Sequence, residues 1–292
     1  MAESHTPDTS SISFTALYTG HVWYANGLSD PAFHSHRGSL FYHALAPFEY
    51  LGGKIAGGNI RTFLLQRHHL IDLQVQRAIS EQGVSQILEI ACGLSPRGLR
   101  LRRDNPTLHY VEADLPGMAA RKHRLLSASQ TLNDKHQVVP LNIFATQGIE
   151  ALENVAARCF DRSQPLLVIT EGLVNYFSLD SIRPFWARLQ ALLSQFPAGI
   201  YLTDNYPLFH DHPFHRTMKT LGGLLGAVSR SQVSFHFASD AETIACFREL
   251  GFADTLVHNP RDYYQQLPIP ASRGNPFVRV IEARTGAAAQ QR

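Results

Sequence analysis

The feature that most constrains the fold is a short apolar segment ending in small residues, followed by a second apolar segment ending in acids. Residues 85–98 read Ser-Gln-Ile-Leu-Glu-Ile-Ala-Cys-Gly-Leu-Ser-Pro-Arg-Gly, and residues 109–116 read His-Tyr-Val-Glu-Ala-Asp-Leu-Pro. The first run is typical of a buried parallel strand, and the small residues that follow let the backbone turn sharply and a ligand come close. Glu112 and Asp114 lie 19 and 21 residues beyond Gly93, where a carboxylate can accept hydroxyl protons of a ribose. These segments predict a nucleoside-binding half of a doubly wound sheet.

Strand-like and helix-like segments alternate from residue 85 onward, which predicts a mainly parallel sheet with crossover helices. The expected strands cover residues 86–91, 109–113, 137–141, 165–170, 199–203, 254–258 and 277–283. The expected helices cover residues 59–80, 97–103, 117–129, 149–159, 179–196 and 240–250. No helical pattern separates the last two strands, so they should pair antiparallel. A seven-stranded α/β, Rossmann-like sheet with a reversed last strand suits a class I methyltransferase better than a nicotinamide dehydrogenase.

Two parts of the chain lie outside this alternation. Residues 1–80 are expected to form an N-terminal helical cap, crowded with aromatic and histidine side chains between residues 14 and 50, and residues 81–292 the core. Residues 206–238 interrupt the core after the fifth strand with prolines, histidines and a Leu/Gly-rich helix. Long insertions at this position tend to build substrate sites or lids.

Composition narrows the class of protein further. The 292 residues are 44% hydrophobic and carry a net charge of +2, which gives no reason to expect nucleic acid or an anionic membrane as the main partner. No secretory signal is visible at the start, and no apolar run is long enough to span a bilayer. The three cysteines are far apart, with no metal or redox spacing. We expect a cytoplasmic enzyme with reduced thiols, and the oligomeric state stays open.

The loop after the first strand favours S-adenosylmethionine over a dinucleotide. The dinucleotide fingerprint needs G-x-G-x-x-G, but Ala91 takes its first position, and Gly98 falls five residues after Gly93 with Pro96 in the turn. A pyrophosphate needs several backbone N–H groups at a helix N-terminus, whereas S-adenosylmethionine has no phosphate. An NAD(P)-dependent oxidoreductase on a similar sheet is kept as the alternative.

Three segments resemble the leucine carboxyl methyltransferase family, which includes bacterial polyketide O-methyltransferases. They are Leu-Glu-Ile-Ala-Cys-Gly-Leu-Ser at 88–95, Val-Glu-Ala-Asp-Leu-Pro at 111–116 followed by Lys122, and Val-Ile-Thr-Glu-Gly-Leu-Val-Asn-Tyr at 168–176. The resemblance covers roughly residues 60–205. It implies an S-adenosylmethionine-dependent O-methyltransferase acting on a carboxylate or hydroxyl of a small molecule.

The resemblance also implies residues that hold the methionine part of the cofactor. Arg67 matches the family arginine that grips the cofactor carboxylate, with Arg61 as a rival. Glu171, at the end of the fourth strand, would face the cofactor's amino group. A lysine that the family uses on the same carboxylate has no counterpart here, and Thr15 or Thr19 lies nearest.

The nucleoside part would be held by residues from the second and third strands. Asp114 matches the ribose-binding aspartate, and Glu112 is kept beside it, although one of the two could be a structural carboxylate facing the next helix. Asn142 and Ile143 match an Asp-Leu pair that recognises adenine, and an asparagine oxygen can still accept from the adenine amino group. The predicted cofactor residues are Arg67, Glu89, Ala91, Gly93, Glu112, Asp114, Asn142, Ile143 and Glu171.

The acceptor pocket is expected between the aromatic cap and the insertion, and should take an aromatic or otherwise apolar molecule. A phenol or alcohol would need a nearby base, whereas a carboxylate would not. The candidate acceptor-site residues are His21, Tyr24, His34, Tyr206, His210 and His212. Histidines at 34 and 36 and at 210, 212 and 215 lack acidic or cysteine partners at a recurrent spacing, so no metal site is expected.

Overall fold

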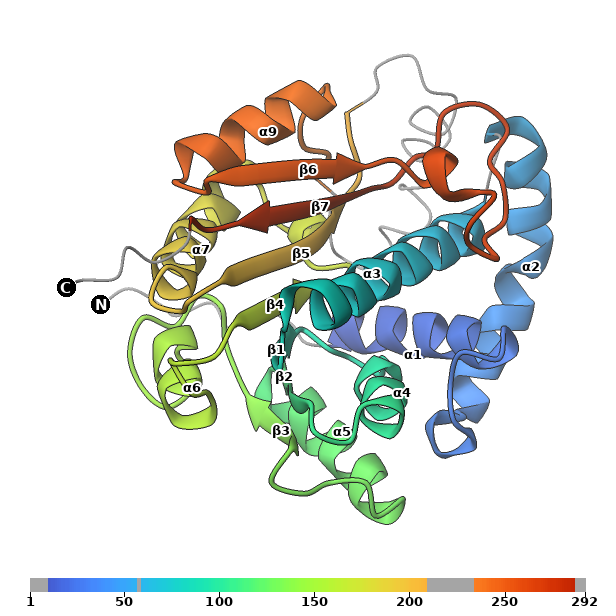
Figure 1. The fold of residues 1–292 in the computed structure, drawn as a ribbon. Coiled ribbons are helices and arrows are strands. Elements are labelled where there is room, and N and C mark those ends of the chain that lie inside the picture. The colour runs from blue at the N-terminus through green and yellow to red at the C-terminus, as the bar shows by residue number, and fades with distance from the viewer. Residues whose placement is uncertain (1–9, 57–58, 209–233, 287–292) are drawn as a thin grey trace, which may run out of the picture.

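Seven strands form one sheet in the computed structural model, which describes residues 10–56, 59–208 and 234–286 (Figure 1). The strands are β1 (Gln86–Ile90), β2 (His109–Asp114), β3 (His136–Pro140), β4 (Leu166–Thr170), β5 (Gly199–Asn205), β6 (Asp254–His258) and β7 (Arg279–Arg284). Their order across the sheet is β3-β2-β1-β4-β5-β7-β6. All neighbours are parallel except β5–β7 and β6–β7, which are antiparallel. The predicted α/β sheet with a reversed last strand is therefore confirmed.

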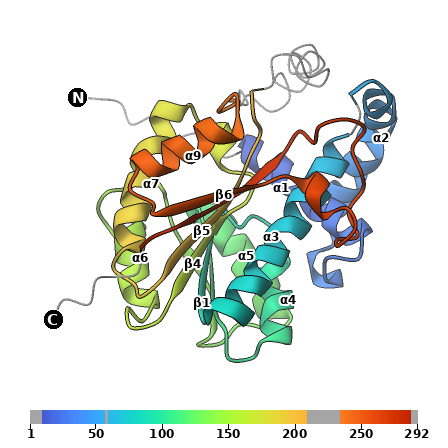
Figure 2. The same cartoon turned by 45° about the horizontal axis from the view of Figure 1, so that its top comes forward.

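Helices cover both faces of the sheet (Figure 2). One face carries α3 (Ile60–Gln82), α4 (Arg97–Asp104) and α5 (Pro116–Ala128), and the other carries α6 (Leu152–Cys159), α7 (Leu179–Leu193) and α9 (Asp240–Glu249). At the carboxyl end of the parallel strands lie α1 (Ser10–Ala25) and α2 (His36–Ala56) (Figure 1). The described residues also include three single-turn 3₁₀ helices: η1 (Pro31–Phe33), η2 (Val174–Tyr176) and η3 (Pro260–Tyr263).

The core is split by the sheet because successive strand side chains point to opposite faces. Leu88 and Val168 belong to the apolar cluster that α6, α7 and α9 complete. Ile87 and Leu167 belong to the cluster on the α3 face. These strands are buried on both faces, which explains why their sequences read as continuous apolar runs.

Local capping sets where the helices begin and end. Asn59 caps α3, its Oδ1 accepting from the Thr62 backbone N–H at 2.8 Å, and Gly83 ends the helix with a φ of 67°. The helix predicted over 149–159 starts only at Leu152. Its first residues form a turn instead, in which the Asn142 N–H donates to the Glu150 carbonyl.

The cap and the insertion are described in part. The Leu/Gly-rich helix expected in the insertion falls within residues 209–233 and lies outside the described residues. The sequence-based division at residue 80 put most of α3 in the cap. In the structure this helix packs on the sheet through Leu70, Ile71 and Val75. None of the helices that the structure describes is long and apolar enough to cross a lipid bilayer.

Candidate active site

A cavity of about 270 Å³ lies at the carboxyl edge of the sheet, under α1 and beside α3. Its wall combines the loop after β1 and the ends of β2, β4 and β5 with side chains from both helices. Six predicted cofactor residues border it: Arg67, Glu89, Ala91, Gly93, Asp114 and Glu171. Of the candidate acceptor-site residues, Tyr206 borders it too. The cavity also draws on both segments between which we expected the acceptor pocket, through Tyr18 of the cap and Phe235 of the insertion.

The loop after β1 turns with a left-handed backbone. Ala91 has a φ of 54° and Gly93 a φ of 49°, a conformation that glycine adopts freely and that strains the backbone of Ala91. The Gly93 N–H donates to Asp114 Oδ2 at 2.8 Å, and the Leu115 N–H donates to Oδ1 at 2.7 Å. Burial raises the pKa of Asp114, and these two bonds oppose that rise. The backbone thus fixes the Asp114 carboxylate at the cavity wall.

Arg67 reaches the cavity from α3 and is held by two acids and a phenol. Its Nε donates to Glu171 Oε1 at 3.1 Å, and its Nη1 donates to Asp204 Oδ2 and to the Tyr206 hydroxyl, both at 3.0 Å. Nη2 has no hydrogen-bond partner among the described residues, so it can donate to a ligand. Burial by itself lowers the pKa of Arg67, but Tyr206, Asp204 and Glu171 raise it above its ordinary value.

Gly172 makes room for this guanidinium. A Cβ at Gly172 would lie 2.6 Å from Arg67 Nη2, and the residue has a φ of 68°. Its N–H donates to Asp204 Oδ1 at 2.6 Å, so the same acid holds both the loop and the arginine. Burial raises the pKa of Asp204, and Arg67 opposes the rise.

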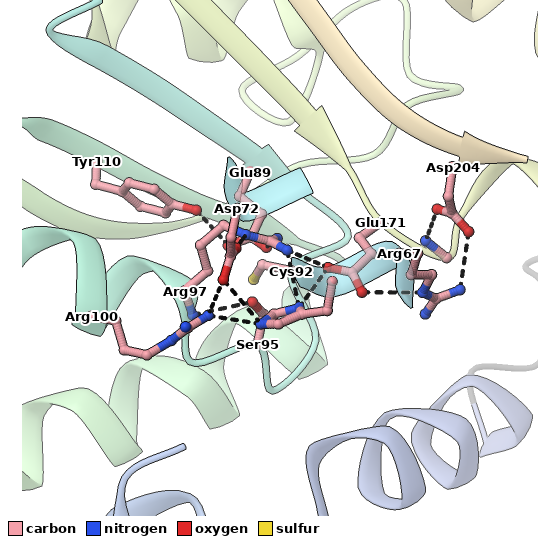
Figure 3. A network of polar contacts seen from close by, with 12 residues as sticks. Arg67, Asp72, Glu89, Cys92, Ser95, Arg97, Arg100, Tyr110, Glu171 and Asp204 are labelled. Carbon is pink, nitrogen blue, oxygen red and sulfur yellow. Dashed lines mark hydrogen bonds and ion pairs between the residues drawn. The ribbon is translucent and has the colours of Figure 1, made fainter. Parts of the chain in front are cut away.

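A second arginine lies on the other side of Glu171 from Arg67, and the charges form a continuous network (Figure 3). Arg97 is fully buried; its Nε donates to Asp72 Oδ1 and its Nη1 to Glu89 Oε1, both at 2.6 Å, and its Nη2 donates to Glu171. The network brings together three guanidinium groups, those of Arg67, Arg97 and Arg100, and four carboxylates, those of Asp72, Glu89, Glu171 and Asp204. His68 also belongs to the network, with its Nδ1 2.9 Å from Glu171 Oε2, so basic side chains and buried acids are paired throughout it.

Three predicted cofactor residues do not border the cavity. Glu112 is buried in an ion pair with Lys122 of the next helix, and its Oε1 lies 2.7 Å from His136 Nε2. Asn142 Oδ1 accepts from the Phe144 N–H at 3.0 Å, and Ile143 packs into the apolar core. The structure therefore gathers Asp114 with the methionine and loop candidates, but neither Glu112 nor the adenine pair.

Three of the four acceptor candidates that the structure describes lie away from the cavity. His21 and Tyr24 pack with His34 in the cap, the His21 ring 5.8 Å from each of theirs. Burial lowers the pKa of His21, and His34 lowers it further. His210 and His212 lie outside the described residues. Among the described residues, no histidine borders the cavity, and no cluster of three or more histidine, cysteine or acidic side chains is placed to hold a metal.

The rival arginine has a different role. Arg61 Nη2 donates to the Tyr42 carbonyl at 2.6 Å, and its guanidinium lies 3.5 Å from the centre of the Tyr42 ring. These contacts tie α3 to α2. Arg61 does not border the cavity, whereas Arg67 does.

Several residues of the site were missed from the sequence. Asp204 directly follows the apolar part of β5, as Glu171 follows β4, and that shared pattern was a usable signal. Trp23 of α1 and Phe63 of α3 border the cavity, but nothing separates their pattern from that of ordinary packing residues. Phe277, just before β7, completes the aromatic wall from a part of the chain far from the other site residues.

Comparisons with known proteins agree with this geometry. Residues 40–188 match the family model for leucine carboxyl methyltransferase, and no curated protein sequence matches the chain. A candidate methyltransferase from Thermobifida fusca YX is similar with a TM-score of 0.65 and 15% identity over 97% of each chain. A DUF574 family protein from Streptomyces avermitilis gives 0.59 and 12%, over 93% of this chain and 97% of its own. A candidate O-methyltransferase from Nostoc punctiforme gives 0.51 and 14%, over 97% and 74%. At these identities the structural likenesses establish the fold.

Proposed function

The chain belongs to the leucine carboxyl methyltransferase family, and from that premise we propose that it methylates an oxygen of an apolar small molecule, a carboxylate in preference to a hydroxyl. Methyltransferase activity and the use of S-adenosylmethionine follow from the family. The oxygen acceptor and its apolar character are our proposal. The observation that carries it is one cavity with a charged floor and an aromatic wall. The charged floor consists of Arg67, Glu89, Asp114 and Glu171, and the aromatic wall of Phe63, Tyr206, Phe235 and Phe277.

The charged floor fits S-adenosylmethionine. When bound, this cofactor supplies a methyl group on a positively charged sulfur, and the positive charge is lost as the methyl group leaves. We propose that Arg67 Nη2 holds its carboxylate, that Glu171 lies near its ammonium group and that Asp114 accepts from the ribose hydroxyls. The carboxylates of Glu89, Asp114 and Glu171 border the cavity and suit the two cationic groups of the cofactor.

The aromatic wall supports an apolar acceptor. The rings of Phe63, Tyr206 and Phe235 all pack around Phe277, with ring centres 5.7–5.9 Å apart. All four residues border the cavity, next to the Arg67 guanidinium that Tyr206 contacts. An apolar surface of this kind excludes water from the reacting atoms and orients a flat or aliphatic molecule.

The absence of a histidine from the described wall supports a carboxylate as the acceptor. A carboxylate is already ionised at neutral pH, so the chain's residues need only orient it and exclude water. A hydroxyl would need a base, and the nearest phenol, Tyr206, is unsuited because burial raises its pKa to about 12. Glu171 is held as a carboxylate by Arg67 and Arg97, which makes it a weak base.

The NAD(P)-dependent oxidoreductase that we kept as the alternative gains nothing from the comparisons. The family that the chain matches is a family of methyltransferases, and the structural neighbour from Thermobifida fusca is itself a candidate methyltransferase.

We also propose a cytoplasmic location. Cys92, Cys159 and Cys246 are free thiols, as is usual in a reducing compartment. Burial raises the pKa of Cys92, which keeps this cavity residue as a thiol of low reactivity.

A product assay tests the acceptor class. The enzyme is incubated with methyl-labelled S-adenosylmethionine and a panel of apolar carboxylic acids and phenols. We expect label in a methyl ester, which mild base hydrolyses, rather than in an ether, which survives the same treatment. Label only in base-stable products would overturn the carboxylate, and label in proteins alone would overturn the small-molecule acceptor.

A pair of phenylalanines separates acceptor binding from cofactor binding. Phe235 borders the cavity, whereas Phe237, two residues on, packs against Trp186 away from it. Phe235→Ala should raise the KM for the acceptor about tenfold and leave the Kd for S-adenosylhomocysteine unchanged. Phe237→Ala should change neither constant. Equal losses for cofactor and acceptor in Phe235→Ala would count against an aromatic acceptor site.

A further inference from the structure

Trp23 carries a buried hydrogen-bond donor that has no partner among the described residues. The side chain is 5% exposed, and its Nε1 is shielded from solvent and makes no hydrogen bond to any of them. An indole N–H can only donate, and burying such a group unpaired costs stability. The chain's other tryptophan shows the ordinary arrangement, since Trp186 Nε1 donates to the Tyr201 hydroxyl at 3.2 Å. An unpaired donor retained at a cavity wall points to a ligand as its partner.

The ring of Trp23 lies at the Arg67 end of the cavity. It packs on the His68 ring, with ring centres 4.8 Å apart and planes inclined by 38°. His68 adjoins Arg67 in α3, and its Nδ1 lies 2.9 Å from Glu171 Oε2. The indole is therefore beside the two residues assigned to the methionine part of the cofactor, whereas Asp114 ends β2 and binds the loop after β1.

We propose that Trp23 is a cofactor-binding residue whose indole N–H donates to the carboxylate of S-adenosylmethionine. The inference rests on the proposed function, because it takes Arg67 as the partner of that same carboxylate. In the methionine part, the ammonium and sulfonium groups are cations that offer no lone pair at neutral pH, so the carboxylate is the group that accepts. Arg67 of α3 and Trp23 of α1, which both border the cavity, then donate to the same carboxylate.

Two ligands that differ only in this carboxylate test the assignment. Calorimetry compares wild type and Trp23→Phe with S-adenosylmethionine and with decarboxylated S-adenosylmethionine. The variant should bind S-adenosylmethionine about tenfold more weakly, the usual cost of a lost hydrogen bond to a charged group. Its affinity for the decarboxylated ligand should stay within about twofold of wild type, because that ligand has no acceptor for the N–H to lose.

The controls separate this role from packing. β-(3-Benzothienyl)alanine at position 23 keeps the shape of the indole and lacks the N–H, so it should reproduce the loss for S-adenosylmethionine even if Trp23→Phe folds poorly. The melting temperature of the unliganded protein should not fall with this replacement, because the N–H has no partner among the described residues. Equal losses for both ligands, or none for S-adenosylmethionine, overturn the assignment of Trp23. Failure of the wild type to bind either ligand would instead overturn the proposed function.

Discussion

The carboxylate of Glu171 is 5% exposed and is surrounded by Arg67, Arg97 and His68. Burial alone would raise its pKa, but His68 and the two arginines hold the pKa well below its usual range. Glu171→Gln leaves these cations with one less buried counter-charge, so it should lower the free energy of unfolding at pH 7 by about 3 kcal/mol. Urea unfolding from pH 7 down to pH 3.5 measures the difference.

The pH dependence of that difference has a definite sign. A carboxyl whose pKa is lowered by folding contributes stability above its unfolded pKa and loses the contribution as the pH falls toward its folded pKa. The gap between wild type and Glu171→Gln should be constant above about pH 5 and shrink below about pH 4.3. Glu249→Gln is the control, because the exposed pair of Glu249 with Arg183 is worth less than about 1 kcal/mol. A gap that widened on acidification would contradict the buried ion pairs.

Two glycines with left-handed backbones separate strain from a specific contact. Gly172 has a φ of 68° and its Cβ would strike Arg67, whereas Gly148 has a φ of 84° and nothing within 4 Å of its Cβ. Both alanine variants should lose about 1–2 kcal/mol of stability to backbone strain. Only Gly172→Ala should weaken binding of S-adenosylhomocysteine, by at least about tenfold, because it displaces the guanidinium. Calorimetry decides, and similar affinities in the two variants would mean that Arg67 does not hold the ligand.

At this scale the sequence predicted the residues whose local context is unambiguous. Glu171 follows a wholly apolar strand and Asp114 precedes a helix that starts with proline, so both were placed at the sheet edge. Glu112 and Asp114 face the same side of β2, but Glu112 lies two residues, or about 6.6 Å, further from the edge, where α4 and α5 cover it. Spacing along a strand gives the face of a residue and not its partners. Asp204 was missed because the expected strand stopped at residue 203 and the expected insertion began at residue 206, so the acid fell between the two.

Among the elements, α4 lies so close to β2 that one of its positions excludes a side chain. A Cβ at Gly98 would lie 2.9 Å from the Tyr110 ring and would also strike the Glu112 carboxylate, which Lys122 holds in place. Gly98→Ala should therefore lower the free energy of unfolding by about 2 kcal/mol. Gly117, near the start of α5, has nothing within 4 Å of its Cβ, so Gly117→Ala should be neutral or stabilising by up to about 1 kcal/mol. Chemical denaturation of both variants checks the contrast, and a stable Gly98→Ala would show that α4 can move away from the sheet.

The elements themselves were the most predictable level. Short apolar runs bounded by turn residues predicted all seven strands. The runs of β1 and β4 were the clearest, because strands buried on both faces leave few other interpretations. Helix ends were less certain, since they depend on hydrogen bonds to distant residues. The bond from the Asn142 N–H to the Glu150 carbonyl, which delays the start of α6, is an example. The 3₁₀ turn η2, which carries Tyr176 to the cavity, has too few residues for a periodic pattern.

For the whole molecule, ligand binding should be visible as a pattern of hydrogen exchange. S-adenosylhomocysteine should slow exchange in residues 60–67, 91–95 and 171–177 and in α1, because these segments border the cavity. Exchange in α9 and β6 should not change, since neither contributes to the wall. Mass spectrometry of the exchanged peptides tests this. Protection spread evenly over the sheet would indicate global stabilisation instead of binding at this edge.

The reversed strand β7 imposes an order on folding. β5 pairs with β7, and β6 has no other neighbour in the sheet, so β6 cannot join until β7 has been placed, although it precedes β7 in the chain. Strands β1 to β5 come first in the chain and are neighbours in the sheet, so they can pair as the chain emerges. One edge of β5 then stays open until β7, some 75 residues later in the chain, arrives. An open central edge is a template for pairing with other chains. During refolding, aggregation should therefore compete with the docking of β7 onto β5. Substitutions that weaken β7 should lower the yield of soluble protein more than they lower the stability of the folded protein.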